Sequence, residues 1–179
     1  VDGIVDRFSE AGLPCFGPRS GPAQLEASKS FTKIFLDRHQ IPTASWQSFT
    51  NAEQAREYVF AHTLPLVLKA DGLAAGKGVI IAHTQVDALN AIDEILVDQR
   101  FGDAGQTLVI EEFLEGVEVS FICVASGTQV IPLATSQDHK AREAGDKGPN
   151  TGGMGAFSPA PNVDPALHKR IMDEIINPT

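Results

Sequence analysis

A glycine-rich turn flanked by two lysines is the first feature whose residue types and spacing suggest chemistry. Lys69 ends an apolar stretch, and Lys77 lies in the turn that follows, among Gly72, Gly76 and Gly78. Glycines let the backbone approach a ligand closely, and the backbone N–H groups of such a turn form an anion-binding concavity. The lysines add charge that neutralises a triphosphate. The turn predicts a phosphate-binding hairpin loop; a solvated hairpin turn with an incidental lysine is the alternative.

Two better-known nucleotide motifs do not fit this turn. A P-loop requires G-x-x-x-x-G-K-[ST], whereas three residues separate Gly72 from Gly76 and Gly78 follows Lys77. The dinucleotide fingerprint G-x-G-x-x-G fails as well, because Ile81 stands where its third glycine belongs. The flanking residues predict strand, turn and strand. Any phosphate site here is therefore a flexible hairpin loop.

An acidic stretch, residues 111–118, joins two further predicted strands. Adenine requires a donor and an acceptor from a connecting backbone, with apolar walls on both of its faces. Phe113 and Leu114 supply such walls. Glu118 lies four residues beyond Leu114, where a carboxylate accepts hydrogen bonds from ribose hydroxyls. The alternative is an acidic strand edge that discourages aggregation, and on this stretch alone that alternative is the stronger one.

The elements that must position these residues follow from the apolar periodicity, which predicts an α+β protein with antiparallel hairpins covered by helices. Lys29 and Lys33 lie four residues apart and share a helix face. Residues 136–155 are polar, glycine-rich and without periodicity, and a long ordered loop of this kind is more often functional than not. The predicted helices are 4–12, 24–39, 50–62 with a capping box begun by Thr50, 84–96 and 164–175, and the predicted strands are 14–18, 65–70, 79–83, 107–113, 117–124 and 129–133.

Composition limits the classes of function. The chain has 179 residues, is 42% hydrophobic and carries a net charge of −9, which argues against binding the phosphate backbone of nucleic acid. No apolar run approaches a membrane span. Cys15 and Cys123 lack metal-site spacing, so we expect buried, reduced thiols in a cytoplasmic protein and no structural zinc. We further expect a monomer, and both chain ends indicate a fragment.

Five segments, taken together and in order, carry a more specific signal than any one of them. They are Ser-Lys-Ser-Phe-Thr-Lys (28–33), Leu-Lys-Ala-Asp-Gly-Leu-Ala-Ala-Gly-Lys-Gly-Val (68–79), Glu-Glu-Phe-Leu-Glu-Gly-Val-Glu-Val-Ser (111–120), Ser-Gln-Asp-His-Lys (136–140) and Gly-Pro-Asn-Thr-Gly-Gly-Met-Gly-Ala-Phe-Ser-Pro (148–159). Over essentially the whole chain they resemble the phosphoribosylamine–glycine ligase family of the ATP-grasp superfamily. The last two segments distinguish this family from biotin carboxylase and D-alanine ligase.

The resemblance implies an ATP-grasp fold, in which two α+β lobes grip ATP, incomplete here on its C-terminal side. Residues 1–27 would be the tail of a preceding domain and a linker. Residues 28–114 would form the first part, including the small lobe with the glycine-rich loop. Residues 115–179 would begin the large lobe. The family's acidic and asparagine metal ligands would lie beyond Thr179, so we expect none here and no turnover by residues 1–179 alone.

The resemblance also implies roles for individual residues. Lys33 and Lys69 would contact the ATP phosphates, the backbone at Glu111, Glu112, Phe113 and Leu114 would hold adenine, and Glu118 would hold the ribose. Asn150 would lie near both nucleotide and substrate, and the catalytic group would be Lys69, Lys77, His139 and Lys140. The loop closing over the phosphates would be Gly72, Leu73, Ala74, Ala75, Gly76, Lys77 and Gly78, and the substrate sites would be lined by Asp138, His139, Lys140, Asn150, Thr151, Gly152 and Gly153.

Two of these positions carry open alternatives. Where the family has an arginine facing the nucleotide, this chain has Ala141, followed by Arg142. Arg142 either reaches the same place after a one-residue adjustment or is a surface charge. His139 either orients substrate or is a hydrogen-bonded structural histidine.

The reaction implied by the resemblance uses ATP with Mg²⁺ or Mn²⁺. It joins glycine to 5-phosphoribosylamine through glycyl phosphate, giving glycinamide ribonucleotide, ADP and phosphate in de novo purine biosynthesis. Two alternatives remain at this point: a nucleotide-binding fragment without catalysis, and another ATP-grasp carboxylate–amine ligase.

Overall fold

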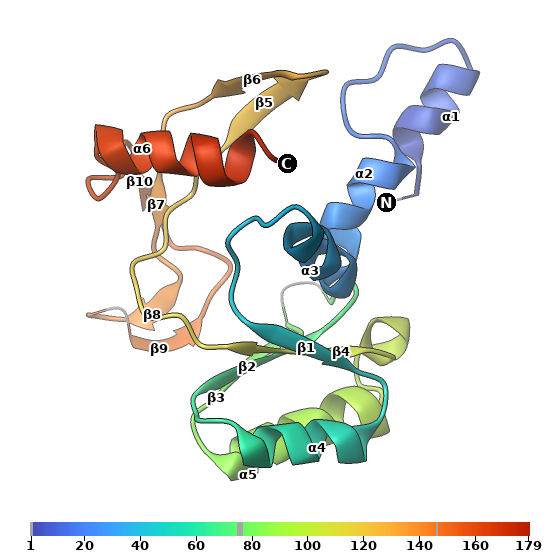
Figure 1. Cartoon of the computed structure of the whole chain (residues 1–179), viewed down its shortest axis with the longest axis vertical. Coiled ribbons are helices and arrows are strands. Elements are labelled where there is room, and N and C mark those ends of the chain that lie inside the picture. The colour runs from blue at the N-terminus through green and yellow to red at the C-terminus, as the bar shows by residue number, and fades with distance from the viewer. Residues whose placement is uncertain (1, 75–76, 146) are drawn as a thin grey trace. The chain divides into compact units, whose positions relative to one another are not determined.

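The computed structural model describes residues 2–74, 77–145 and 147–179, and at positions 141, 147, 149 and 150 it describes the backbone alone. The chain divides into two compact units, Val1–Leu114 and Glu115–Thr179 (Figure 1). The assignment of the units to lobes stays a prediction.

The first unit is built on a four-stranded antiparallel sheet with the order β1-β4-β2-β3. Its strands are β1 (Trp46–Phe49), β2 (Leu66–Ala70), β3 (Val79–Ala82) and β4 (Leu108–Glu112). The predicted strands at 65–70, 79–83 and 107–113 are confirmed by β2, β3 and β4. The chain passes directly from β2 to its neighbour β3, so the glycine-rich turn joins two hydrogen-bonded strands.

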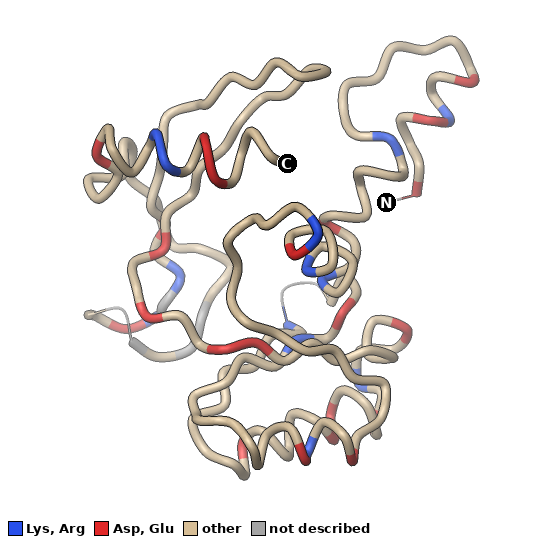
Figure 2. The backbone as a smooth tube through the Cα atoms, in the orientation of Figure 1, with Lys and Arg blue, Asp and Glu red and all other residues tan. Residues whose placement is uncertain are grey.

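Helices lie on both sides of the sheet. Figure 1 shows α4 (Ala52–Ala61) and α5 (Gln85–Ile92) beneath the strands, and α3 (Lys29–Arg38) on the opposite side. Acidic and basic positions are interspersed along the chain, and α3 carries several basic ones (Figure 2). The helices of this unit are α1 (Ile4–Glu10), α2 (Ser20–Ala27), α3 (Lys29–Arg38), α4 (Ala52–Ala61) and α5 (Gln85–Ile92), followed by the π-helical turn η1 (Asp93–Val97) and the 3₁₀ turn η2 (Gly102–Gly105).

The core lies between the sheet and helices α4 and α5. Leu68 and Ile110 are paired across β2 and β4, are fully buried, and pack with Val59, Ile92 and Ile95 from the helical side. Because side chains alternate along a strand, the intervening residues of β2 and β4 must face the other way. Every second residue of these two strands therefore lies on the face of the sheet opposite the core.

The ends of two helices are set by side-chain caps. Thr84 begins α5 with a reciprocal capping box: its Oγ1 accepts from the Asp87 N–H at 3.1 Å, and the Asp87 carboxylate accepts from the Thr84 N–H at 3.0 Å. These bonds hold the pKa of Asp87 below its ordinary value. Helix α4 begins after Asn51, whose side chain accepts from the Gln54 N–H. The predicted capping box begun by Thr50 is therefore wrong by one residue.

The predicted helix over residues 24–39 is two helices. Ser28 separates them because its backbone is extended, and its hydroxyl accepts from the Phe31 N–H at 3.1 Å to cap α3. Serine favours a cap over a helix interior because its hydroxyl competes for backbone hydrogen bonds.

The strand predicted at 14–18 is absent from the described residues, where that segment pairs with no other strand.

The second unit consists of short hairpins and one helical segment. The predicted strand 117–124 is mostly wrong, because only its last two residues enter a strand, β5. The polar segment 136–155 contains three short strands, over 137–138, 141–143 and 147–150, so it is more ordered than its lack of periodicity indicates. The elements are β5 (Cys123–Ser126) paired with β6 (Gln129–Pro132), β7 (Gln137–Asp138) with β10 (Ala156–Phe157), β8 (Ala141–Glu143) with β9 (Lys147–Asn150), and α6 (Pro165–Ile171) continued by η3 (Met172–Ile176).

The described helices include none with both the length and the apolar character needed to cross a membrane. Both cysteines are free thiols. Cys15 is exposed, so the expectation that it is buried is wrong. Cys123 is half-buried, and burial raises the pKa of its thiol.

Truncation of the central core residue Ile110 to alanine should destabilise the first unit by about 2–5 kcal/mol, since it removes apolar contacts and leaves a cavity. The same truncation at Ile34, which is 50% exposed on α3, should change stability by about 0.5 kcal/mol. Chemical denaturation followed by circular dichroism compares the two variants. Equal losses for Ile110→Ala and Ile34→Ala would show that the core does not lie under the sheet as described.

Candidate functional site

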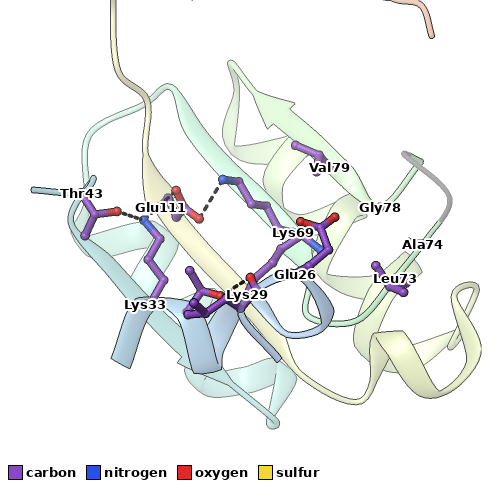
Figure 3. Close-up of a pocket in the computed structure, with 12 residues that line it drawn as sticks. Glu26, Lys29, Lys33, Thr43, Lys69, Leu73, Ala74, Gly78, Val79 and Glu111 are labelled. Atoms are coloured by element: carbon purple, nitrogen blue, oxygen red, sulfur yellow. Dashed lines mark hydrogen bonds and ion pairs between the residues drawn. The ribbon is translucent and has the colours of Figure 1, made fainter. Parts of the chain in front are cut away.

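A cavity of about 860 Å³ lies on the face of the first unit's sheet that is turned away from the core. Its walls come from α2, α3, the chain before β1, the strands β2, β3 and β4, and the glycine-rich turn. Figure 3 shows the labelled side chains around it. The lining residues are Leu25, Glu26, Lys29, Thr32, Lys33, Thr43, Lys69, Leu73, Ala74, Gly78, Val79 and Glu111.

One buried carboxylate joins two lysines in this cavity. Glu111 is only 6% exposed; its Oε2 lies 3.0 Å from the Nζ of Lys33 and its Oε1 lies 2.8 Å from the Nζ of Lys69. Lys69 pairs with Val109 in the β2–β4 ladder, and Glu111 pairs with Val67, so the two charged residues are diagonal neighbours on one face. The ladder itself therefore sets this contact.

Lys33 is held more tightly than an ordinary surface lysine. It is 7% exposed, and besides Glu111 its ammonium donates to the Thr43 hydroxyl at 2.7 Å and to the Ala44 carbonyl at 3.2 Å. Two hydrogen bonds and one ion pair thus hold its ammonium. Lys33 therefore contributes a fixed positive charge to the wall of the cavity.

Lys29 is a third cavity lysine, to which the sequence assigned no role. Its ammonium donates to the carbonyls of Asp71 at 3.3 Å and Gly72 at 3.0 Å. Burial lowers the pKa of Lys29, the Asp71 carboxylate opposes that effect, and the charge of Lys69 lowers it further. The sequence predicted that Lys29 shares a helix face with Lys33, but not that it lines the cavity.

The start of the glycine-rich turn is fastened to α3. The Asp71 carboxylate accepts from the Ser30 N–H at 2.6 Å and from the Ser28 hydroxyl at 2.9 Å. An anionic side chain at a helix N-terminus is favourable, because it satisfies free N–H groups and lies at the positive end of the helix dipole. Asp71 thus fixes the turn to the helix that carries Lys29 and Lys33.

Glycine is required in the turn for packing as well as for any ligand. A Cβ added at Gly72 would lie 2.9 Å from the Ala104 Cα, and one added at Gly78 would lie 2.6 Å from the Ala74 Cβ. The exposed Lys77 donates its N–H to the Ala74 carbonyl at 2.9 Å. Leu73 and Ala74 line the cavity, while the predicted loop residues Ala75 and Gly76 lie outside the described residues.

The segment predicted to hold adenine leaves β4 beside the cavity. The Glu112 N–H is used by the Ser45 carbonyl at 3.0 Å, and the Glu112 carboxylate accepts from the Ser45 N–H at 2.9 Å. Phe113 is half-buried, with its ring centroid 6.5 Å from that of His83, and Leu114 is 64% exposed. Across the described residues, the N–H groups of Phe113 and Leu114 have no backbone partner.

A second charged cluster lies in the second unit. The Lys140 ammonium is 2.6 Å from the Glu118 carboxylate and 3.5 Å from that of Asp138. The hydrogen bond that Lys140 donates to the Glu118 carboxylate raises the pKa of Lys140, although burial opposes this. The other oxygen of Asp138, Oδ1, is buried and has no hydrogen-bond partner among the described residues, which is costly unless another donor satisfies it.

The remaining predicted residues lie around this cluster. The His139 ring centroid is 5.3 Å from that of Phe157, and the His139 backbone bonds with Gly155 and Met154. Thr151 donates its N–H to the Lys140 carbonyl at 2.7 Å, and its hydroxyl accepts from the Gly153 N–H at 3.1 Å. Gly152 lies between these two residues and is exposed.

Two predicted contacts are not visible in this arrangement. The Arg142 side chain is 62% exposed and pairs with Glu143 at 3.1 Å, so its guanidinium lies at the surface of the second unit. Asn150 belongs to β9, and its side chain lies outside the described part of the structure. In the described ranges, no three His, Cys, Asp or Glu side chains gather in a way that could hold a metal ion.

Comparison with known proteins bears on the whole chain. Residues 27–179 match the family model of the phosphoribosylglycinamide synthetase ATP-grasp (A) domain. The phosphoribosylamine–glycine ligase of Vibrio parahaemolyticus is 59% identical over 179 residues, which is 100% of this chain and 42% of that protein. The chain thus spans about two fifths of the length of the curated relatives it matches.

Solved structures agree with this match. The crystal structure of phosphoribosylamine–glycine ligase from Thermotoga maritima has a TM-score of 0.83 and 34% identity, covering 91% of this chain and 41% of that one. A D-alanine–D-alanine ligase from Coxiella burnetii has a TM-score of 0.72 at 17% identity, covering 99% and 46%, and shows the fold alone. The predicted α+β ATP-grasp fold is confirmed, and the chain belongs to the family of the phosphoribosylglycinamide synthetase ATP-grasp (A) domain.

Proposed function

We propose that the protein containing this chain is an ATP-dependent ligase that joins glycine to 5-phosphoribosylamine. The γ-phosphoryl group of ATP passes to the glycine carboxylate, giving glycyl phosphate. The amine of phosphoribosylamine then attacks the acyl carbon, and glycinamide ribonucleotide, ADP and phosphate are released. The observation that carries the proposal is the lysine-lined cavity in a chain 59% identical, along its full length, to a phosphoribosylamine–glycine ligase.

The cavity suits a nucleoside triphosphate in charge and size. Its three ammonium groups come from Lys29, Lys33 and Lys69, and apolar side chains such as Leu73 and Val79 supply the rest of the wall. A volume of about 860 Å³ lies in the range of sites for small ligands. Phosphoryl transfer depends on positioning and charge neutralisation more than on covalent help from the protein, and these residues provide both.

The segments next to the cavity complete the proposed nucleotide site. We assign adenine to the backbone after β4, where the N–H groups of Phe113 and Leu114 are available and the Glu112 N–H is already used. Residues 72–78 are assigned to the phosphates, and their closure would keep water from an acyl phosphate.

The second unit supplies the proposed substrate contacts. Asp138, with one carboxylate oxygen unsatisfied among the described residues, and Lys140 are suited to an amine and to an anionic group, respectively. Glu118, which pairs with Lys140 here, is assigned to the ribose, and His139 with residues 150–153 to glycine and phosphoribosylamine.

A divalent cation, Mg²⁺ or Mn²⁺, is proposed to accompany ATP and neutralise its phosphates. The described residues contain no cluster of three His, Cys, Asp or Glu side chains that could hold this ion. A cytoplasmic location is proposed as well, in keeping with the two free thiols.

The proposed reaction predicts that the protein forms ADP only when glycine and freshly generated phosphoribosylamine are both present. The acyl phosphate forms on glycine, and the amine is required to consume it. A coupled assay of ADP release measures this dependence, with either substrate omitted as the control. Equal ADP release with D-alanine replacing both substrates would assign the chain to a different ligase reaction.

Replacing Lys69 by alanine should weaken ATP binding by about ten- to a hundredfold, because one charged hydrogen bond to phosphate contributes roughly 1.5–3 kcal/mol. Isothermal titration calorimetry measures the affinity. Lys169→Ala is the matched control, since Lys169 is an exposed lysine of α6 paired with Asp173. Unchanged ATP affinity in Lys69→Ala would remove Lys69 from the proposed site.

A further inference from the structure

We infer that the carboxylate of Glu111 is a positioning residue, which holds Lys69 in place for the nucleotide by linking it to the buried Lys33. The inference rests on the proposed function, because it concerns how that site binds ATP. It assigns the Glu111 side chain a task separate from the adenine contact proposed for the backbone of the same segment.

The two oxygens of Glu111 are divided between two lysines. Oε2 faces Lys33 at 3.0 Å and Oε1 faces Lys69 at 2.8 Å, and Figure 3 shows the two lysines extending toward this carboxylate from different sides. The lysines come from separate elements, α3 and β2, so the carboxylate is the contact that fixes one ammonium relative to the other. Removing Lys33 or Lys69 would leave one Glu111 oxygen without its partner, and Glu111 would no longer link the two lysines.

Counting donors separates the roles of the two lysines. Lys33 donates hydrogen bonds to Thr43 and Ala44 and forms an ion pair with Glu111. Lys69 has Glu111 as its one hydrogen-bonding or ionic partner among the described residues, so its ammonium, which can donate three hydrogen bonds, retains donors for a ligand. Lys69 is also the more accessible of the pair, with a side chain 24% exposed against 8% for Lys33. Lys69 is therefore the member of the pair that is ready to donate to a phosphate.

Positioning of this kind favours binding through entropy. A lysine side chain loses much rotamer freedom when it is fixed, and a contact that fixes it before the ligand arrives removes that cost from association. Glu111 also reduces repulsion between the two ammonium groups that it contacts. Glutamine has no negative charge and replaces one of the two oxygens by an NH₂ group, which cannot accept from an ammonium. Lys33 keeps its hydrogen bonds to Thr43 and Ala44, so glutamine at position 111 should release Lys69.

The test is a double-mutant cycle on ATP affinity in the gene product that contains this chain, measured by calorimetry. Glu111→Gln should weaken ATP binding tenfold or more when Lys69 is present. In a Lys69→Ala background the same change should weaken binding less than threefold, because its effect passes through Lys69. Glu57→Gln, which removes an exposed carboxylate from α4, is the control and should leave affinity unchanged in both backgrounds.

Other outcomes overturn the inference in distinguishable ways. Equal losses in both backgrounds would mean that Glu111 contacts the nucleotide directly. A lowered melting temperature with unchanged affinity would mean that the bridge only stabilises the fold. If Glu111→Gln does not fold, Glu111→Asp serves instead: it keeps the charge but is one methylene too short for both lysines, and parent-like affinity would refute the inference.

The proposed function fails separately from this inference. Absence of ADP release with glycine and phosphoribosylamine, combined with a non-additive cycle on ATP affinity, would reject the reaction and keep the role of Glu111. If the cycle is additive and the protein makes ADP only with both substrates, the reaction is kept and the role of Glu111 is rejected. A parent protein that does not bind ATP would reject both.

Discussion

The alternation of side chains across the paired strands β2 and β4 is the constraint on which the site depends. Leu68 and Ile110 must face α4 and α5 to form the core, and this leaves Lys69 and Glu111 on the other face. A shift of one residue in this ladder would bury the charges under the helices and expose the core. The apolar packing of the unit therefore fixes the register that brings the lysine and the carboxylate together.

Sequence patterns predicted the parts that depend on local chemistry. The apolar runs of β2, β3 and β4 and the cap at Thr84 followed from periodicity and side-chain hydrogen bonding alone. The helix over 24–39 was predicted as continuous because its apolar spacing continues through Ser28. The break depends on Asp71, more than forty residues away in sequence, whose carboxylate makes the serine and the start of α3 a docking point. Such a long-range partner leaves no local periodicity to detect.

The same distinction applies to the candidate site. Lys69 was singled out by the glycine-rich turn that follows it, and Lys33 by the resemblance. Glu111 was considered only for its backbone, since it lies in a run of acidic residues that resembles a strand edge. Its burial and its two lysine partners arise from the order of strands in the sheet, which the sequence does not state. Lys29 was missed for a related reason: its cavity contacts are two carbonyls, which carry no signal in residue type. The glycines at 72 and 78 were predicted for ligand approach, and contacts with Ala104 and Ala74 require them in any case.

An acidic chain can still present a site for a polyanion, because local arrangement outweighs net charge at contact distances. The chain carries a net charge of −9, yet three ammonium groups and only two carboxylates line the cavity, and one of those carboxylates is already shared between two lysines. Charges beyond about 10 Å are largely screened by salt, while partly buried ones are screened far less. The acidic surface therefore opposes nonspecific binding of polyanions without weakening the attraction inside the cavity. The Glu111 carboxylate, which Lys33 and Lys69 share, adds to this discrimination. Only an anion whose charge lies where Glu111 holds the Lys69 ammonium gains an attraction to that ammonium.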